Sequence, residues 1–190
     1  EVRVRPLCEL IEVKVEAWRN AIEGYLSTQR FDLIIDPLYF NDALEVYDRV
    51  KSEYGIYGVG LVNTAKLGEY DKYQANSLAS KVESDHPYAR SYANMILGNT
   101  ICVENLADLK NYNRSITKTA MTYSNHTARQ INPKLYEVPY IGQSATSMQV
   151  ELDEELYESQ EKGLAKIQVL IDKNNQLLRI LSQSKLGTIV

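Results

Sequence analysis

The 190-residue sequence has little cysteine, proline or glycine: two Cys, five Pro and nine Gly. Two distant cysteines, Cys8 and Cys102, cannot build a disulfide framework. We interpret both as buried free thiols, with a single disulfide as the alternative. The sequence is also 44 % hydrophobic and 24 % charged, which excludes collagenous, low-complexity and disordered classes. This composition is typical of a folded soluble protein.

Long hydrophobic runs are absent as well, because apolar residues never follow one another more than three at a time. A bilayer-spanning helix needs about 20 apolar residues, and a signal peptide also needs an apolar core. We therefore expect no membrane contact and a cytoplasmic location, at the nucleoid if the source is prokaryotic. The sequence starts at Glu1 instead of Met, which indicates a piece of a longer protein.

Motifs for catalysis and metal binding are missing too. The sequence contains no phosphate-binding G-x-x-x-x-G-K-[ST] loop, and the glycines of GIYGVG (55–60) lead into an expected strand instead of a helix. The candidate zinc ligands Cys8, Cys102, His86 and His126 include no closely spaced pair. We expect no enzyme activity, no cofactor and no metal in this chain.

Strand and helix patterns alternate in the first third. Apolar residues spaced three and four apart predict a helix over 18–26 and another from the Asp36-Pro37 start to residue 54. Residues 31–35 form a short apolar run typical of a buried strand. A further strand is expected over 56–62, around Gly58 and Gly60, where another chain could approach the backbone closely.

The alternation restarts after a polar, aperiodic stretch. We interpret 67–77 as a linker between a first subdomain (1–66) and a second (78–145), each with strands and helices. The second is expected to contain a helix over 85–97, a strand over 99–103, a short helix near 105–110 and strand-like pieces at 115–117, 120–124 and 135–141. The predicted fold class is α/β, with two small mixed sheets and flanking helices.

The tail, residues 150–184, has a different pattern. Its 3–4 spacing of apolar residues predicts a coiled-coil seam with one Asn inside it: Leu164, Ile167, Ile171, Asn174, Leu178 and Leu181. The seam covers fewer than three heptads, so a single amphipathic helix packed on its own domain is the alternative.

Several strings in this order resemble the hinge domain of SMC-type ATPases. RPLCELIEV, AIEGYL, FDLII, ALEVYDRVK and YGVGLVN are similar to the first hinge subdomain. YARSYANMILGNTICVENLADL and SITKTAMTY are similar to the second. The end, LYEVPYIGQSA, has only Gly142 where SMC hinges are usually Gly-rich. It looks more like the hinges of MukB-like and other condensin-type ATPases, including the plasmid-restricting Wadjet type.

The resemblance implies a dimerisation hinge that joins two coiled-coil arms so that DNA can be enclosed, with the ATPase heads outside this sequence. It implies a homodimer in which the first subdomain of one copy pairs with the second subdomain of the other. An arm of the same chain is the expected partner of the tail. The expected interface residues are Tyr57, Gly58, Val59, Gly60, Leu61, Ile116, Met121, Tyr123 and Tyr140.

The net charge of −4 excludes a uniformly basic nucleic-acid binder, but the charge is uneven. Residues 109–136 contain no acid and five bases, interleaved with tyrosines: Lys110, Arg114, Lys118, Arg129 and Lys134. Cations beside aromatics can hold phosphates and stack bases, so weak DNA contact is predicted here. Alternatively, the Lys and Arg stems simply cover apolar surface. The alternative function for the whole chain is a stand-alone α/β adaptor that binds a partner through its C-terminal helix.

Overall fold

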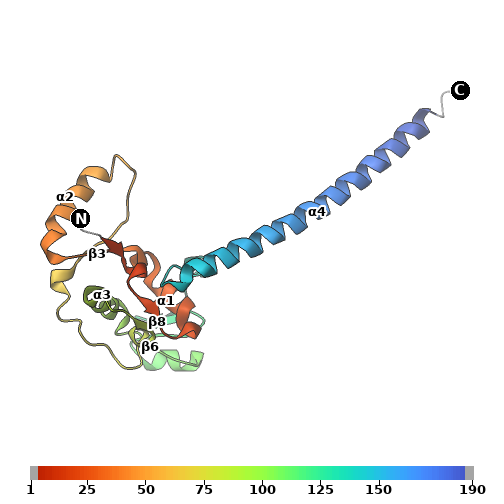
Figure 1. Ribbon diagram of the computed structural model, residues 1–190. Coiled ribbons are helices and arrows are strands. Elements are labelled where there is room, and N and C mark those ends of the chain that lie inside the picture. The colour runs from red at the N-terminus through yellow and green to blue at the C-terminus, as the bar shows by residue number, and fades with distance from the viewer. Residues whose placement is uncertain (1–3, 187–190) are drawn as a thin grey trace. The chain divides into compact units, whose positions relative to one another are not determined.

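A computed structural model describes residues 4–186 as a mixed α/β structure followed by one long helix (Figure 1). The expected α/β class is confirmed. The chain divides into two units, Glu1–Ser147 and Met148–Val190. No helix of the described part is long and apolar enough to cross a membrane. The helices are α1 (Arg19–Leu26), α2 (Phe40–Val50), α3 (Pro87–Leu97) and α4 (Ser144–Leu186).

Within residues 4–186, nine short strands form three sheets. The first sheet has the order β1-β3-β4, made of Arg5–Pro6, Leu33–Ile35 and Leu61–Asn63, with β3 antiparallel to β1 and parallel to β4. A two-stranded sheet pairs β2 (Glu12–Val13) with β5 (Val82–Glu83). The last sheet has the order β6-β7-β8-β9, made of Ile101–Cys102, Arg114–Ile116, Met121–Ser124 and Thr127–Gln130. Because β2 precedes the segment 67–77 and β5 follows it, this two-stranded sheet joins the parts of the first unit on either side of that segment.

The hydrophobic core lies around α1 and α3. Apolar residues three and four apart place one stripe of each helix inward, and the members of both stripes are 0 % exposed: Ala21, Ile22 and Leu26 of α1, and Ala89, Ala93 and Leu97 of α3. His86 begins α3 by accepting a hydrogen bond from the Ala89 N–H at 3.3 Å. Residues before and after 67–77 contribute to this one core.

Helix α2 differs, because none of its eleven residues is buried. Asp36 caps the turn that precedes it, accepting the Leu38 N–H at 2.9 Å, and Pro37 follows as the first residue of that turn. In Figure 1, α2 lies near β3 and away from α1 and α3. This placement leaves much of its apolar stripe accessible.

The structure corrects three local predictions. The helices expected over 18–26, 36–54 and 85–97 are present with shorter bounds, but the strand expected over 56–62 covers only Leu61–Asn63. The strand-like piece at 135–141 contains no strand, and β9 (Thr127–Gln130) was not predicted. The segment 67–77 is irregular as expected. However, its end residues Leu67 and Ser77 are buried at 4 % and 0 % exposure, and the division into subdomains stays a prediction.

The long helix α4 extends the predicted 150–184 tail at both ends. Side chains of the predicted seam are exposed in the second unit, from 45 % for Ile171 to 66 % for Leu164. A coiled-coil partner for this seam stays a prediction.

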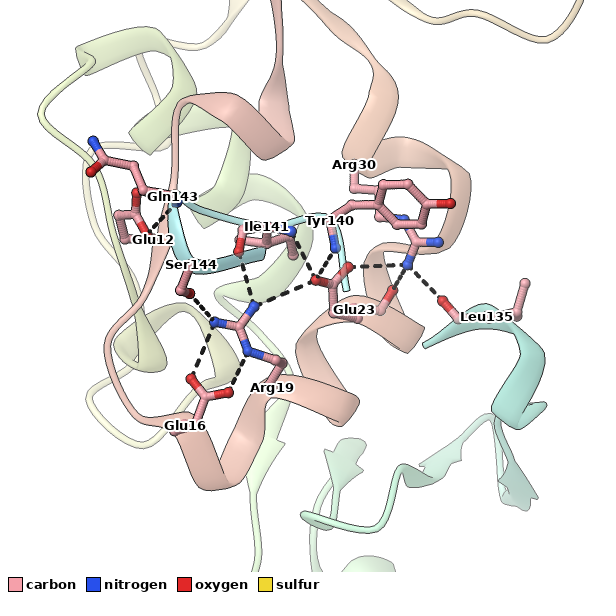
Figure 2. Close-up of polar contacts among 10 residues, drawn as sticks. All are labelled: Glu12, Glu16, Arg19, Glu23, Arg30, Leu135, Tyr140, Ile141, Gln143 and Ser144. Atoms are coloured by element: carbon pink, nitrogen blue, oxygen red, sulfur yellow. Dashed lines mark hydrogen bonds and ion pairs between the residues drawn. The ribbon is translucent and has the colours of Figure 1, made fainter. Parts of the chain in front are cut away.

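A buried carboxylate joins distant parts of the first unit. The Glu23 side chain of α1 is 0 % exposed, and its Oε1 accepts the backbone N–H groups of Tyr140 and Ile141, both at 2.8 Å (Figure 2). Its Oε2 lies 3.1 Å from Arg30 Nη1, and Arg19 Nη1 lies 3.7 Å from Oε1. Two guanidinium groups and two amides thus compensate a charge that water cannot reach.

We expect Glu23→Gln to lower the free energy of unfolding by about 3–5 kcal/mol, because it leaves the buried Arg30 without its counter-charge. The matched control is Glu16→Gln, since Glu16 pairs with the same Arg19 but its side chain is 59 % exposed. It should cost less than about 1 kcal/mol. Urea unfolding followed by circular dichroism measures both, and equal losses in the two variants would contradict the assignment.

Candidate self-association surface

The two faces of the β1-β3-β4 sheet have different environments. Strand residues alternate between faces, and Ile34 and Val62 point into the core at 5 % and 7 % exposure. Leu33, Ile35 and Leu61 therefore point to the opposite face, where the register places Leu33 beside Leu61. That outer face is apolar and is covered by α2.

The cover is incomplete and leaves a groove of about 690 Å³ between the sheet and α2. Leu33, Ile35 and Leu61 form its floor. Helix α2 contributes a stripe with helical spacing: Ala43, Val46, Tyr47 and Val50. Among the residues that the structure describes, Asp42 is the only charged one that lines the groove. An open, apolar groove of this kind is typical of a surface that another molecule covers.

The loop over 51–60 borders the groove and holds four of the nine predicted interface residues. Val59 lines the groove with Leu61, whereas Tyr57 does not line it and is 69 % exposed. Gly58 has a φ of 78°, a left-handed conformation that favours glycine. Within the described residues β4 has β3 as its single neighbour, so its other edge is open to a partner strand.

Gly60 allows a close approach to Asp32. A Cβ atom at position 60 would overlap the Asp32 carboxylate, whose Oδ2 accepts the Tyr92 hydroxyl at 2.6 Å. Burial and this carboxylate together raise the pKa of Tyr92, so the phenol stays protonated. Glycine at position 60 thus accommodates the Asp32 carboxylate, which any larger residue there would have to displace.

The structure places the predicted residues of the second half within the other sheet. Ile116 is 0 % exposed in β7, and Met121 and Tyr123 are half-buried in β8. Both strands have neighbours on two sides, so neither offers a free backbone edge. In the described chain the free edge is β9, whose four residues are all exposed. The interface role of the three residues stays a prediction, and the open edge beside them was missed.

Tyr140 lies beside the groove instead of on a strand. Its ring meets Phe31, a groove residue, edge-on at a centroid distance of 5.0 Å. The backbone N–H of Tyr140 is held by Glu23. No sequence motif identifies Glu23, because the amides of Tyr140 and Ile141 that bind it are more than a hundred residues away along the chain.

The five predicted DNA contacts are exposed side chains around the last sheet. In the strand register Arg129 lies opposite Thr122, and Thr122 lies opposite Ile116. Ile116 is two residues after Arg114 on the same strand, so their side chains point to the same face. Arg114 and Arg129 therefore share one face of the sheet. Lys118 is already paired with Glu104 at 2.6 Å, whereas the other four cations form no ion pair with described residues.

The thiols and imidazoles show no reactive site. Cys8 and Cys102 are free, and burial raises their pKa values to about 11 and about 12, so both are protonated at neutral pH. Within residues 4–186, no three His, Cys, Asp or Glu side chains gather as metal ligands.

Gly60→Ala should lower the free energy of unfolding by about 1–3 kcal/mol, because the new methyl group displaces Asp32 and disturbs its bond with Tyr92. Gly68→Ala is the matched control, since no atom lies within 4 Å of its added Cβ. We expect it to be neutral or slightly stabilising. Thermal unfolding compares the two, and an unchanged Tm for Gly60→Ala would contradict the packing described.

No family model and no curated protein matches the chain. Solved structures do match. The Pyrococcus furiosus SMC protein hinge domain aligns with a TM-score of 0.53 and 20 % identity over 66 % of this chain and 70 % of that chain. An asymmetric dimer of the Geobacillus stearothermophilus SMC hinge domain aligns at 0.53 and 16 %, over 83 % and 71 %. The Pyrococcus furiosus Smc hinge domain with an extended coiled coil aligns at 0.52 and 20 %, over 83 % and 61 %. The chain therefore has the fold of the SMC hinge domain.

Proposed function

We propose that this chain is a self-association hinge, which joins two copies of the longer protein that carries it. The observation that carries the proposal is the open apolar groove beside the free edge of β4. The fold supports it, since one of the similar hinge structures is a dimer. Joining two arms in this way would allow DNA to be enclosed between them.

The groove leaves several large apolar side chains partly accessible to water. Val46 is 48 % exposed, Tyr39 is 41 % exposed and Ile56 is 40 % exposed, and all three line it. Full burial of one such side chain contributes about 1.5–3 kcal/mol. Several together can offset the cost of association, which is of the order of 4–15 kcal/mol. A bound partner would thus be stabilised chiefly by this groove.

Charge favours a second copy as the occupant of the groove. Residues 31–61, which surround the groove, contain six acidic and two basic side chains, a net charge of −4. Residues 109–136 carry five bases and no acid, and they also expose Tyr112 (44 %) and Leu135 (37 %). The acidic groove region and this basic strip, residues 109–136, are therefore complementary in charge and in apolar character.

Each copy has one groove and one strip, so two copies related by a two-fold axis make two equivalent contacts. Such an arrangement closes on itself and stops at a dimer. The open edges of β4 and β9 lie in the two surfaces that meet, and they can extend each other's sheets by backbone hydrogen bonds. The branch of the SMC-like proteins and the coiled-coil partner of α4 stay predictions from the sequence.

Val46→Asp should weaken self-association by about thirtyfold or more, because it places a carboxylate in the groove where an apolar contact is proposed. Leu44→Asp is the matched control: Leu44 is on the same helix and 43 % exposed, but it does not line the groove. Sedimentation equilibrium measures both dissociation constants. A strictly monomeric parent chain, or equal effects of the two substitutions, would refute the proposal.

Contact with DNA is a second candidate function, favoured by Arg114 and Arg129 on one face of a sheet and without ion-pair partners among the described residues. In a mobility-shift assay the double variant Arg114→Glu/Arg129→Glu should reduce the salt dependence of DNA binding by roughly 1.5–2 units of log–log slope. Lys14→Glu, outside the strip, is the control.

Both candidates use the same guanidinium groups, so sedimentation of the double variant separates them. A weaker dimer with unchanged DNA binding assigns the two arginines to self-association. Lost DNA binding with an unchanged dimer assigns them to DNA, and unchanged DNA binding excludes them as the DNA contacts.

A further inference from the structure

The wall of the groove continues to the segment that precedes α4. Phe31 lines the groove, and its ring packs edge-on against Tyr140, with both side chains 39 % exposed. The Arg30 guanidinium lies over both rings, 5.0 Å from the Phe31 centroid and 4.7 Å from that of Tyr140. One cation therefore holds two aromatic rings at the end of the groove.

Hydrogen bonds to three oxygen atoms fix the position of the Arg30 guanidinium. Its Nη1 donates to Glu23 Oε2 at 3.1 Å, to the Glu23 backbone oxygen at 3.2 Å and to the Leu135 oxygen at 2.6 Å (Figure 2). The Arg30 side chain is 8 % exposed. Because all three acceptors contact Nη1, they fix where the guanidinium lies against the ring pair.

The same carboxylate reaches the start of α4 through Arg19. Arg19 Nη1 lies 3.7 Å from Glu23 Oε1 and donates to the Ile141 oxygen at 2.9 Å, and Nη2 donates to Ser144 Oγ at 3.0 Å (Figure 2). Ser144 is the first residue of α4. Every step from Phe31 to Ser144 is thus a ring contact, a hydrogen bond or an ion pair, and all lie within the first unit.

We propose that self-association at the groove and the anchoring of the first turn of α4 are coupled through Glu23, an inference that rests on the proposed function. The element with two arrangements is the segment 135–144, either held by Glu23 and the two arginines or released from them. A buried carboxylate that loses one partner is left undercompensated, so its partners are held or released together.

A second copy in the groove contacts Phe31 and Tyr140 and so favours the held arrangement. By reciprocity, the factor by which a bound second copy favours the held arrangement equals the factor by which the held arrangement strengthens the binding of that copy. Weakening the hold on the α4 start therefore weakens the dimer. Arg19 and Ser144 do not line the groove, so they act only as positioning residues.

Arg19→Met tests the coupling in the full chain. We expect it to raise the dissociation constant of the dimer roughly tenfold, within the common range of coupling between sites. The matched control is Arg90→Met. Arg90 also donates to two backbone oxygens, Val82 at 2.6 Å and Ala79 at 2.9 Å, but it is outside the network and does not line the groove. The dissociation constant of the Arg90→Met dimer should change by less than about twofold, although this variant loses a comparable free energy of unfolding.

Ser144→Ala is a milder variant that removes a single hydrogen bond, and we expect a two- to threefold weaker dimer. Hydrogen exchange gives an independent readout, because the Tyr140 and Ile141 amides donate to Glu23. In the unmodified chain their protection should rise as dimer forms with concentration, and in Arg19→Met it should rise less.

The outcomes are distinct. A chain that stays monomeric at all concentrations overturns both the hinge function and the coupling. A dimer whose dissociation constant is the same in Arg19→Met as in Arg90→Met, or whose Tyr140 and Ile141 amides exchange at a rate independent of concentration, overturns the coupling alone.

Discussion

The buried carboxylate of Glu23 is the constraint on which the rest of the first unit depends. An ionised carboxylate without water needs compensating donors, and here they come from α1, from the turn after it and from the segment before α4. These parts are up to 118 residues apart in sequence. Meeting the requirement of one side chain therefore fixes the end of the groove, the Phe31–Tyr140 pair and the first turn of α4 together.

The two faces of the β1-β3-β4 sheet are packed differently, and the proposed function depends on this difference. One face packs against the core shared with α1 and α3, and the other carries only α2, which has no buried residue. Apolar burial in the groove supplies affinity in the proposed dimer, whereas opposite charges on the groove region and the basic strip set which surfaces meet and in what orientation. Weak surface charges alone would not hold two copies together, because salt screens exposed ion pairs.

The sequence predicted the helices and the family resemblance well, because both depend on local periodicity and on the order of short strings. It predicted a strand over 56–62 because apolar residues alternate there, but the glycines allow a loop in which Gly58 adopts a positive φ. Strand β9 was missed because Thr127, Ala128, Arg129 and Gln130 lack the apolar alternation of a half-buried strand. The Glu23 network could not be found, since nothing local indicates which acid in a helix is buried.

The central claim, that the groove of one copy meets the basic strip of another, can be tested by crosslinking two singly substituted proteins. Val46→Cys places a thiol in the groove, and Tyr112→Cys places one on the strip. Burial raises the pKa values of the native Cys8 and Cys102 thiols and keeps their background reaction low. A short bismaleimide should join a mixture of the two variants into a mixed dimer far more efficiently than a mixture of Leu44→Cys and Tyr112→Cys. Equal yields from the two mixtures, or no mixed dimer in either, would contradict the account.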